Sequence, residues 1–245
     1  LANGIHAELT ASGFTGVHRY TFPASDSAFL RVDTESSFAG TYTATSRQVG
    51  AQEFQVEVTA KNTCEVGRYR VFYHVWCSKP LNEAPDAGPT WFISFSAQAR
   101  EEVLLYVTAS SVSAEAARRR WESQAKGKPF DAFAAETAQR WERLLSRIEV
   151  EGGRDEKVLF YSHLYHLFLN PVQTDDQSAE LQAGGEPAFA PYGCWSMWDN
   201  FRTKFPLYPY LVPEEARDIA HSLAHLYRNG MPSWSGYNEP APTVR

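Results

Sequence analysis

The hydrophobic pattern of the chain changes its period near Ser113, and this change limits the fold more than any other feature. Before Ser113, apolar side chains follow the two-residue alternation of half-buried strands. In Tyr69–Cys77 (YRVFYHVWC), for example, Val71, Tyr73 and Val75 share one face. After Ser113, apolar residues recur every three or four positions, as in amphipathic helices. We therefore expect a β domain followed by an α domain, rather than alternating strands and helices.

The first 110 residues contain several short strands separated by polar or Gly/Pro turns. The predicted strands cover residues 17–23, 28–33, 41–45, 53–58, 69–77, 90–96 and 103–109. The second face of strand 69–77 carries Arg70, Phe72, His74 and Trp76. Many short strands with such turns are typical of a β-sandwich.

Capping residues and prolines mark the helices that follow. Ser113 is a predicted N-cap, and Asp131 is predicted to cap a second helix whose apolar stripe runs over 133–145. A third helix is expected from about Asp155 to Asn170, where Pro171 ends it. Its apolar stripe consists of Val158, Tyr161, Leu164, Tyr165 and Phe168.

Two further helices are predicted near the end of the chain. One should extend from Trp198 to about Pro206. The other has the clearest signals, because Pro213 suits a first turn and Asn229-Gly230 supplies a left-handed stop after Arg228. Its buried stripe is predicted to consist of Ala216, Ile219, Ala220, Leu223 and Tyr227. The helices over 113–147 would then connect the β part to the α part.

Charge and composition exclude several classes of protein. The net charge is −6 and the basic residues are scattered, so we expect no nucleic-acid partner. No stretch approaches the roughly 18 apolar residues of a membrane span. The cysteines are too few for a disulfide framework, and whether Cys64 and Cys77 pair is left open. The chain has no start Met or signal peptide, and we interpret it as a piece of a longer protein.

A Gly/Pro-rich loop leads into the segment Tyr192–Arg202 (YGCWSMWDNFR), which combines residue types that bind sugars. Trp198 can stack on the apolar face of a pyranose ring, and Asp199 can accept hydrogen bonds from two hydroxyl groups. In the alternative interpretation, Trp198 belongs to the core and Asp199 is a helix cap paired with Arg202. The residues alone leave these two interpretations open.

Other polar residues are weaker candidates. The loop 230–240 contains Trp234 and Glu239, which can face a ligand or lie in an ordinary surface loop. The adjacent carboxylates Asp175-Asp176 are a weak signal for a cation, and His163 with His166 favours a structural role because no third ligand is near. No pair of carboxylates stands out as the acid and base of a glycosidase.

The segments, taken together, resemble those of glycoside hydrolase family 92, the calcium-dependent α-mannosidases. The matching segments are VHRYTFP (17–23), YHVWCSKP (73–80), RIEVEGG (147–153), FYSHLYHLFLNP (160–171), SMWDNFRTKFPL (196–207) and MPSW (231–234). They occur in the family's order over nearly the whole chain. The chain is therefore identified as the N-terminal and early-barrel part of such an enzyme.

The resemblance implies a β-sandwich at 1–110, a helical linker at 111–150 and the first part of an (α/α)6 catalytic barrel at 151–245. It also implies exo-cleavage of terminal α-linked mannose from glycans, with inversion and with bound Ca²⁺. The catalytic acid, the base and most calcium ligands are expected further along the barrel, so no catalytic or metal-binding residue is assigned here. The remaining barrel of the same protein is the expected structural partner, and the expected location is extracellular, secreted or at the cell surface.

The resemblance assigns the sugar contact to Trp198 and Asp199, with Arg202 in support and with Trp234 and Glu239 from the second loop. The chain departs from the family pattern after Glu239, where it reads EPAPTVR. Thr243 and Arg245 in this ending suit an anionic substrate, such as mannose linked through a phosphodiester. The other alternative is a non-catalytic carbohydrate-binding module built on the sandwich.

Overall fold

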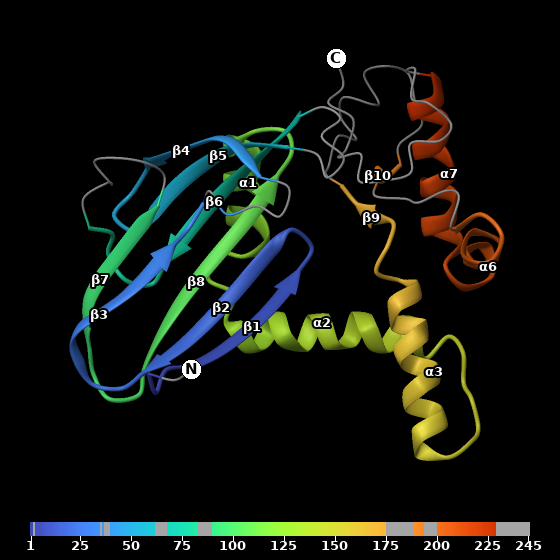
Figure 1. Cartoon of the computed structure of the whole chain (residues 1–245), viewed down its shortest axis with the longest axis horizontal. Coiled ribbons are helices and arrows are strands. Elements are labelled where there is room, and N and C mark those ends of the chain that lie inside the picture. The colour runs from blue at the N-terminus through green and yellow to red at the C-terminus, as the bar shows by residue number, and fades with distance from the viewer. Residues whose placement is uncertain are drawn as a thin grey trace. The chain divides into compact units, whose positions relative to one another are not determined.

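The computed structural model describes residues 1, 3–34, 36, 40–61, 68–82, 90–174, 189–193 and 200–228. The chain forms two compact units, one of residues 1–61 and 68–140 and the other of residues 62–67 and 141–245. The first unit is mostly β and the described part of the second is mostly α (Figure 1). The predicted fold class, a β-sandwich followed by helices, is confirmed.

Two antiparallel sheets make up the first unit (Figure 1). The larger sheet has the strand order β1-β2-β8-β6-β5-β4. Its strands are β1 (His6–Ser12), β2 (Thr15–Phe22), β4 (Thr41–Gln48), β5 (Glu53–Lys61), β6 (Arg68–Cys77) and β8 (Glu101–Ser110). The smaller sheet pairs β3 (Ser25–Val32) with β7 (Trp91–Ala97). Among the residues that the structure describes, two strands therefore face a sheet of six.

The core of the sandwich lies between the two sheets. The rings of Phe54 and Trp91 stack with their centroids 4.4 Å apart, and both side chains are almost completely buried. The indole N–H of Trp91 donates to the Ser46 hydroxyl at 2.9 Å, so the buried polar atom is satisfied. Cys77 also lies in this core, and its thiol is free rather than in a disulfide.

Helices cover the opposite face of the larger sheet. Helix α1 (Ala114–Gln124) packs on β6 and β8, and α2 (Phe130–Leu145) follows it. Trp121 of α1 contacts the rings of His74 and Trp76, so the second predicted face of strand 69–77 packs against this helix. The predicted N-cap of α1 is confirmed, because the Ser113 hydroxyl accepts from the Ala116 N–H at 3.0 Å.

The predicted cap of α2 is wrong. The helix begins at Phe130, so Asp131 lies in its first turn rather than before it. The Asp131 carboxylate accepts instead from the Arg19 guanidinium at 3.0 Å. Asp131 therefore forms an ion pair with a residue of β2 instead of a local cap.

The described part of the second unit consists of helices and a short hairpin. These are α3 (Arg154–Leu167), β9 (Val172–Gln173), β10 (Tyr192–Gly193), α6 (Lys204–Leu211) and α7 (Pro213–Arg228). Leu164, Tyr208, Leu211, Val212 and Ile219 form its buried cluster. The structure places α3 where the sequence predicted it, but two residues of the predicted stripe, Val158 and Tyr165, are exposed.

The next helix agrees with its prediction only in part. It was expected over 198–206. Asn200 is helical, residues 201–203 form a turn, and α6 begins at Lys204 and continues through Pro209 to Leu211; residues 198 and 199 lie outside the described residues. The final helix has the predicted bounds, Pro213 to Arg228. Ala220, which belongs to the predicted buried stripe, is exposed, whereas Ser222, which does not belong to it, is buried. No helix in the described ranges is long and apolar enough to cross a membrane.

Candidate functional site

Four of the five predicted sugar-contacting residues, Trp198, Asp199, Trp234 and Glu239, lie outside the described residues. Arg202 is described. It is exposed in the turn before α6, and its guanidinium lies 5.2 Å from the centre of the Phe201 ring. The sugar contacts of all five residues therefore remain predictions. What the structure does show is how the chain is held on either side of residues 194–199.

Helix α7 holds the chain before this segment. The Ala190 N–H donates to the Asp218 carboxylate at 3.2 Å, and the Tyr192 N–H donates to the Ser222 hydroxyl at 3.0 Å. Ser222 itself donates to the carbonyl of Asp218, one turn earlier in α7, at 2.7 Å. The Thr174 N–H donates to the Pro191 carbonyl at 2.9 Å and joins β9 to this stretch. Side chains of one helix thus fix the backbone entering the predicted sugar loop.

Helix α6 holds the chain after the segment. The Tyr208 hydroxyl lies within hydrogen-bonding distance of two carbonyls at the end of α3, Leu167 at 2.9 Å and Asn170 at 2.8 Å. The Arg147 guanidinium donates to the Leu211 carbonyl at the C-terminal end of α6. The middle and the C-terminal end of this two-turn helix are therefore tied to other parts of the unit.

Burial sets the protonation of the groups around these anchors. It raises the pKa of Tyr192 to about 12, with the charges of Glu215 and Asp218 adding to the effect. Burial also raises the pKa of Tyr208 and lowers that of Lys204. The tyrosines are therefore neutral hydrogen-bonding groups at neutral pH.

Lys204 is the notable residue that the sequence did not reveal. Its side chain is buried at the start of α6, with its ammonium nitrogen 5.8 Å from the centre of the Tyr208 ring. Within the described ranges it forms no ion pair with a carboxylate. A single lysine in a helix gives no local signal that separates a buried side chain from an exposed one.

The described residues do not supply a calcium site. They contain no group of three or more His, Cys, Asp or Glu side chains that could hold a metal ion. His163 and His166 are both exposed on α3, and Asp175-Asp176 lies outside the described residues. We therefore assign no calcium ligand to this segment and no chemical step that passes through the ion.

Comparison with protein families defines the class of protein. Residues 1–119 match the glycosyl hydrolase family 92 N-terminal domain, and residues 116–244 match the glycosyl hydrolase family 92 catalytic domain. The two matches together span nearly the whole chain, in the order sandwich and then helices. The chain belongs to glycosyl hydrolase family 92, and the resemblance seen in its sequence motifs is confirmed. The helices after the sandwich correspond to the beginning of the family's (α/α)6 barrel.

Solved structures of this family share the fold. The family GH92 α-mannosidase BT3965 from Bacteroides thetaiotaomicron has a TM-score of 0.82 and 23% identity, covering 96% of this chain and 36% of that chain. The GH92 family glycosyl hydrolase ccman5 has a TM-score of 0.74 and 27% identity, covering 91% of this chain and 33% of that chain. The family GH92 inverting mannosidase BT2199 from Bacteroides thetaiotaomicron has a TM-score of 0.77 and 20% identity, covering 96% of this chain and 35% of that chain. The chain thus spans about a third of the length of these structures. No curated protein matches it.

Proposed function

We propose that this chain is the sandwich and early-barrel part of an exo-α-mannosidase that removes terminal α-linked mannose from glycans with inversion. The observation that carries the proposal is the pair of family matches that cover the sandwich and the helices in succession. The structures titled α-mannosidase and inverting mannosidase share its fold and support the choice of sugar and stereochemistry.

The proposed role of this segment is to bind the sugar rather than to break the bond. Trp198 would stack on the terminal mannose and Asp199 would accept hydrogen bonds from its hydroxyl groups, because a carboxylate can accept bidentately. Arg202, Trp234 and Glu239 would line the same site. The anchors from α7 and α6 on either side of residues 194–199 would hold the loop in position. The acid and the base of an inverting glycosidase would come from the rest of the barrel.

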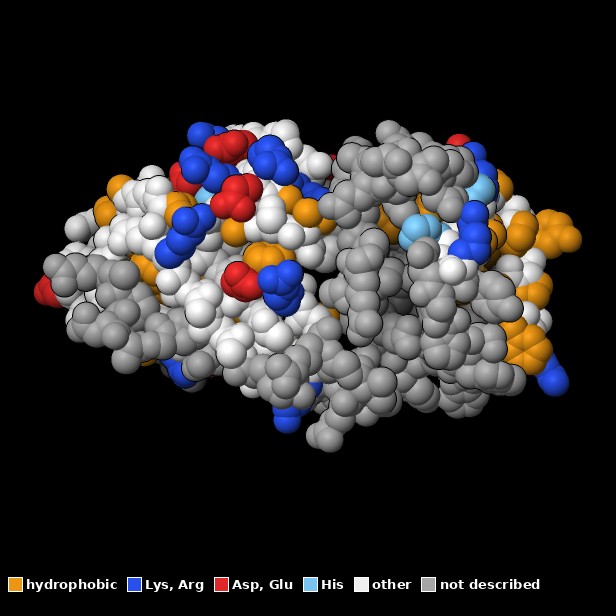
Figure 2. Space-filling model, turned by 90° about the horizontal axis from the view of Figure 1, so that it is seen from above, with side chains coloured by type: hydrophobic (Ala, Val, Ile, Leu, Met, Phe, Trp, Pro, Cys, Tyr) orange, Lys and Arg blue, Asp and Glu red, His pale blue; other side chains and the backbone are white. Residues whose placement is uncertain are grey.

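The proposal includes calcium as the cofactor, bound by ligands supplied mainly by the rest of the protein. It also places the enzyme outside the cell, secreted or at the cell surface, where mannose-containing glycans are displayed. The exposed apolar residues of the second unit support a need for the remaining barrel, because contiguous exposed apolar surface marks an interface. The apolar side chains of this unit with large exposed fractions include Tyr210, Phe201 and Leu207. Figure 2 shows apolar side chains on the surface of this unit.

The test is release of mannose from α-mannosides by the full-length protein, with and without chelation of calcium. We expect free mannose, initially as the β anomer seen by NMR, and loss of activity after EDTA that added Ca²⁺ restores. Release of the α anomer would contradict inversion. Full activity after thorough chelation would contradict the calcium requirement.

A family variant that cleaves mannose-phosphate-mannose is the alternative suggested by the EPAPTVR ending, whose residues lie outside the described ranges. Arg245→Ala in the full-length enzyme separates the two substrates. Loss on a mannosyl phosphodiester with unchanged activity on mannobiose would favour the variant, and equal loss on both would exclude it. Binding of mannosides without any hydrolysis would favour the non-catalytic module.

A further inference from the structure

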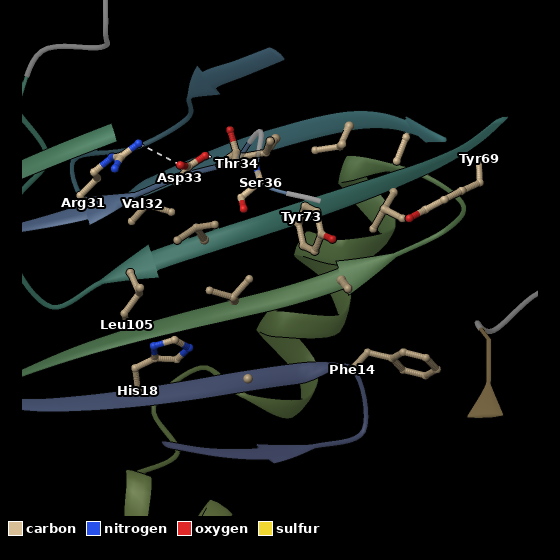
Figure 3. A pocket seen from close by; sticks show the side chains of 18 of the residues that line it. Phe14, His18, Arg31, Val32, Asp33, Thr34, Ser36, Tyr69, Tyr73 and Leu105 are labelled. Atoms are coloured by element: carbon tan, nitrogen blue, oxygen red, sulfur yellow. Dashed lines mark hydrogen bonds and ion pairs between the residues drawn. The ribbon is translucent and has the colours of Figure 1, made fainter. Parts of the chain in front are cut away.

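A hollow of about 650 Å³ opens on the inner face of the larger sheet. It lies over the part of this face that β2, β8, β6 and β5 form. Val71, Val107 and Leu105 are among the aliphatic residues that line it. The end of β3 forms one border (Figure 3). The volume falls within the ~300–1,000 Å³ of small-molecule pockets.

Polar groups line this hollow from two strands, β2 and β6, that have β8 between them. His18 Nδ1 lies 2.8 Å from the Tyr20 hydroxyl, so the two side chains form one hydrogen-bonded unit on β2. Tyr73 and Tyr69 of β6 line the same space, and their hydroxyls bond to no other group within the described ranges (Figure 3). These hydroxyls are therefore available to donate to and accept from a bound ligand or water.

The lining presents hydrogen-bonding groups without unpaired charge. Burial lowers the pKa of His18 and raises the pKa of Tyr20 and Tyr73, so all three are neutral near pH 7. At the border, the Arg31 guanidinium donates to the Asp33 carboxylate at 2.9 Å (Figure 3). A charged ligand would therefore lose its hydration without gaining an opposite charge.

We propose that this hollow is a binding site for a short neutral saccharide, formed by the sandwich alone. The choice of a saccharide rests on the proposed function, because the protein would act among glycans. The chemistry of the lining agrees with it: sugar hydroxyls both donate and accept, as tyrosine hydroxyls do, while the C–H face of a sugar ring suits the aliphatic floor and the aromatic rings. A purely aliphatic ligand would leave the tyrosine hydroxyls unpaired, which costs free energy.

The test is a calorimetric titration of the full-length protein with a sulfur-linked α-mannobiose, which glycosidases do not hydrolyse. Tyr73→Phe removes only the hydroxyl, and Val71→Trp fills the hollow. Tyr106→Phe is the matched control, because Tyr106 lies on the same sheet but faces the helices, where it donates to the Lys128 carbonyl. The kcat/KM for an α-mannoside is measured on all four proteins.

We expect the wild type and Tyr106→Phe to bind more than one equivalent of saccharide. Tyr73→Phe should weaken one binding event about two- to tenfold, and Val71→Trp should abolish it, with kcat/KM unchanged. Titrations that are identical in wild type, Tyr73→Phe and Val71→Trp, in a protein that still hydrolyses mannosides, would overturn the inference and leave the proposed function intact. Saccharide binding that Tyr73→Phe weakens, in a protein without hydrolytic activity, would support the site and contradict the proposed function.

Discussion

Acid should weaken the contact between the sheet and helix α1 through one histidine. His74 is fully buried on β6, and the centroid of its ring lies 4.9 Å from that of Trp121. Within the described ranges neither ring nitrogen forms a hydrogen bond. Glu53 Oε2 lies 3.5 Å from His74 Nε2, and Arg118 Nη2 lies 3.9 Å from the same carboxylate oxygen. The imidazole thus has one carboxylate near it, and a guanidinium already approaches that carboxylate.

Burial, followed by the positive charge of Arg118, lowers the pKa of His74 from 6.5 to about 4, while Glu122 acts in the opposite direction. The folded protein therefore keeps this imidazole neutral at a pH where the unfolded chain binds a proton. The stability that depends on His74 is complete above about pH 6.5 and decreases as the pH falls toward 4. The full shift corresponds to on the order of 3 kcal/mol in the free energy of unfolding.

The assay is urea unfolding of the full-length protein and its His74→Gln and Ile93→Val variants, followed by circular dichroism at about pH 7.5 and about pH 4.5. The variant His74→Gln should lose stability at the higher pH through poorer packing, and this loss should shrink or reverse at the lower pH. Ile93→Val removes packing in the core between the two sheets, away from the His74–Trp121 contact, so its loss should be equal at both values. A His74→Gln difference that does not change with pH would contradict the expected titration of His74.

Three further substitutions test particular contacts. Ser113→Ala should lower the free energy of unfolding by about 1 kcal/mol in urea titrations, and Ser113→Asp should restore it, because either side chain caps α1; equal losses in both variants would contradict the capping role. Tyr208→Phe removes the hydroxyl that lies near two carbonyls at the end of α3 and should lower the free energy of unfolding by about 1 kcal/mol in the same titrations. An unchanged unfolding midpoint would show that water replaces the hydroxyl. Asp199→Asn should reduce kcat/KM on an α-mannoside about 10- to 100-fold with an unchanged unfolding midpoint, and full activity would remove Asp199 from the sugar site.

Features set by neighbouring residues were predictable from the sequence. Alternation along 69–77 indicated which residues share each face of the strand, and the structure places Val75 in the core between the sheets and His74 against Trp121. The bounds of α7 followed from Pro213 and from the acidic residues after it, because helix ends depend on a few adjacent side chains. The cap of α1 by Ser113 was predictable for the same reason.

Features set by distant residues were not predictable. Arg19 of β2 takes the carboxylate of Asp131, and no local pattern indicates that pair. The predicted helix ended near Pro206, yet α6 continues through Pro209 to Leu211, where the Tyr208 hydroxyl and the buried Leu211 hold it against the rest of its unit. Proline within a helix removes one backbone hydrogen bond, and tertiary contacts here outweigh that loss. The exposure of Val158 and Tyr165 on α3 is understandable if the remaining barrel packs there, as proposed.

The structure tests the predicted sugar-binding residues least. Their chemistry and their family pattern indicated them, and four of the five lie outside the described ranges. The structure adds the supports around the loop, namely the Asp218 and Ser222 contacts from α7. These depend on a separation of about 30 residues along the chain, which local patterns do not reveal.

Mannosidase activity is tested most simply by the release of mannose from an α-mannoside by the full-length protein in the presence of Ca²⁺. We expect free mannose, appearing first as the β anomer, together with loss of release after chelation and its recovery on adding Ca²⁺. A correctly folded full-length protein that binds mannosides but releases no mannose from any α-linkage or phosphodiester would contradict this expectation.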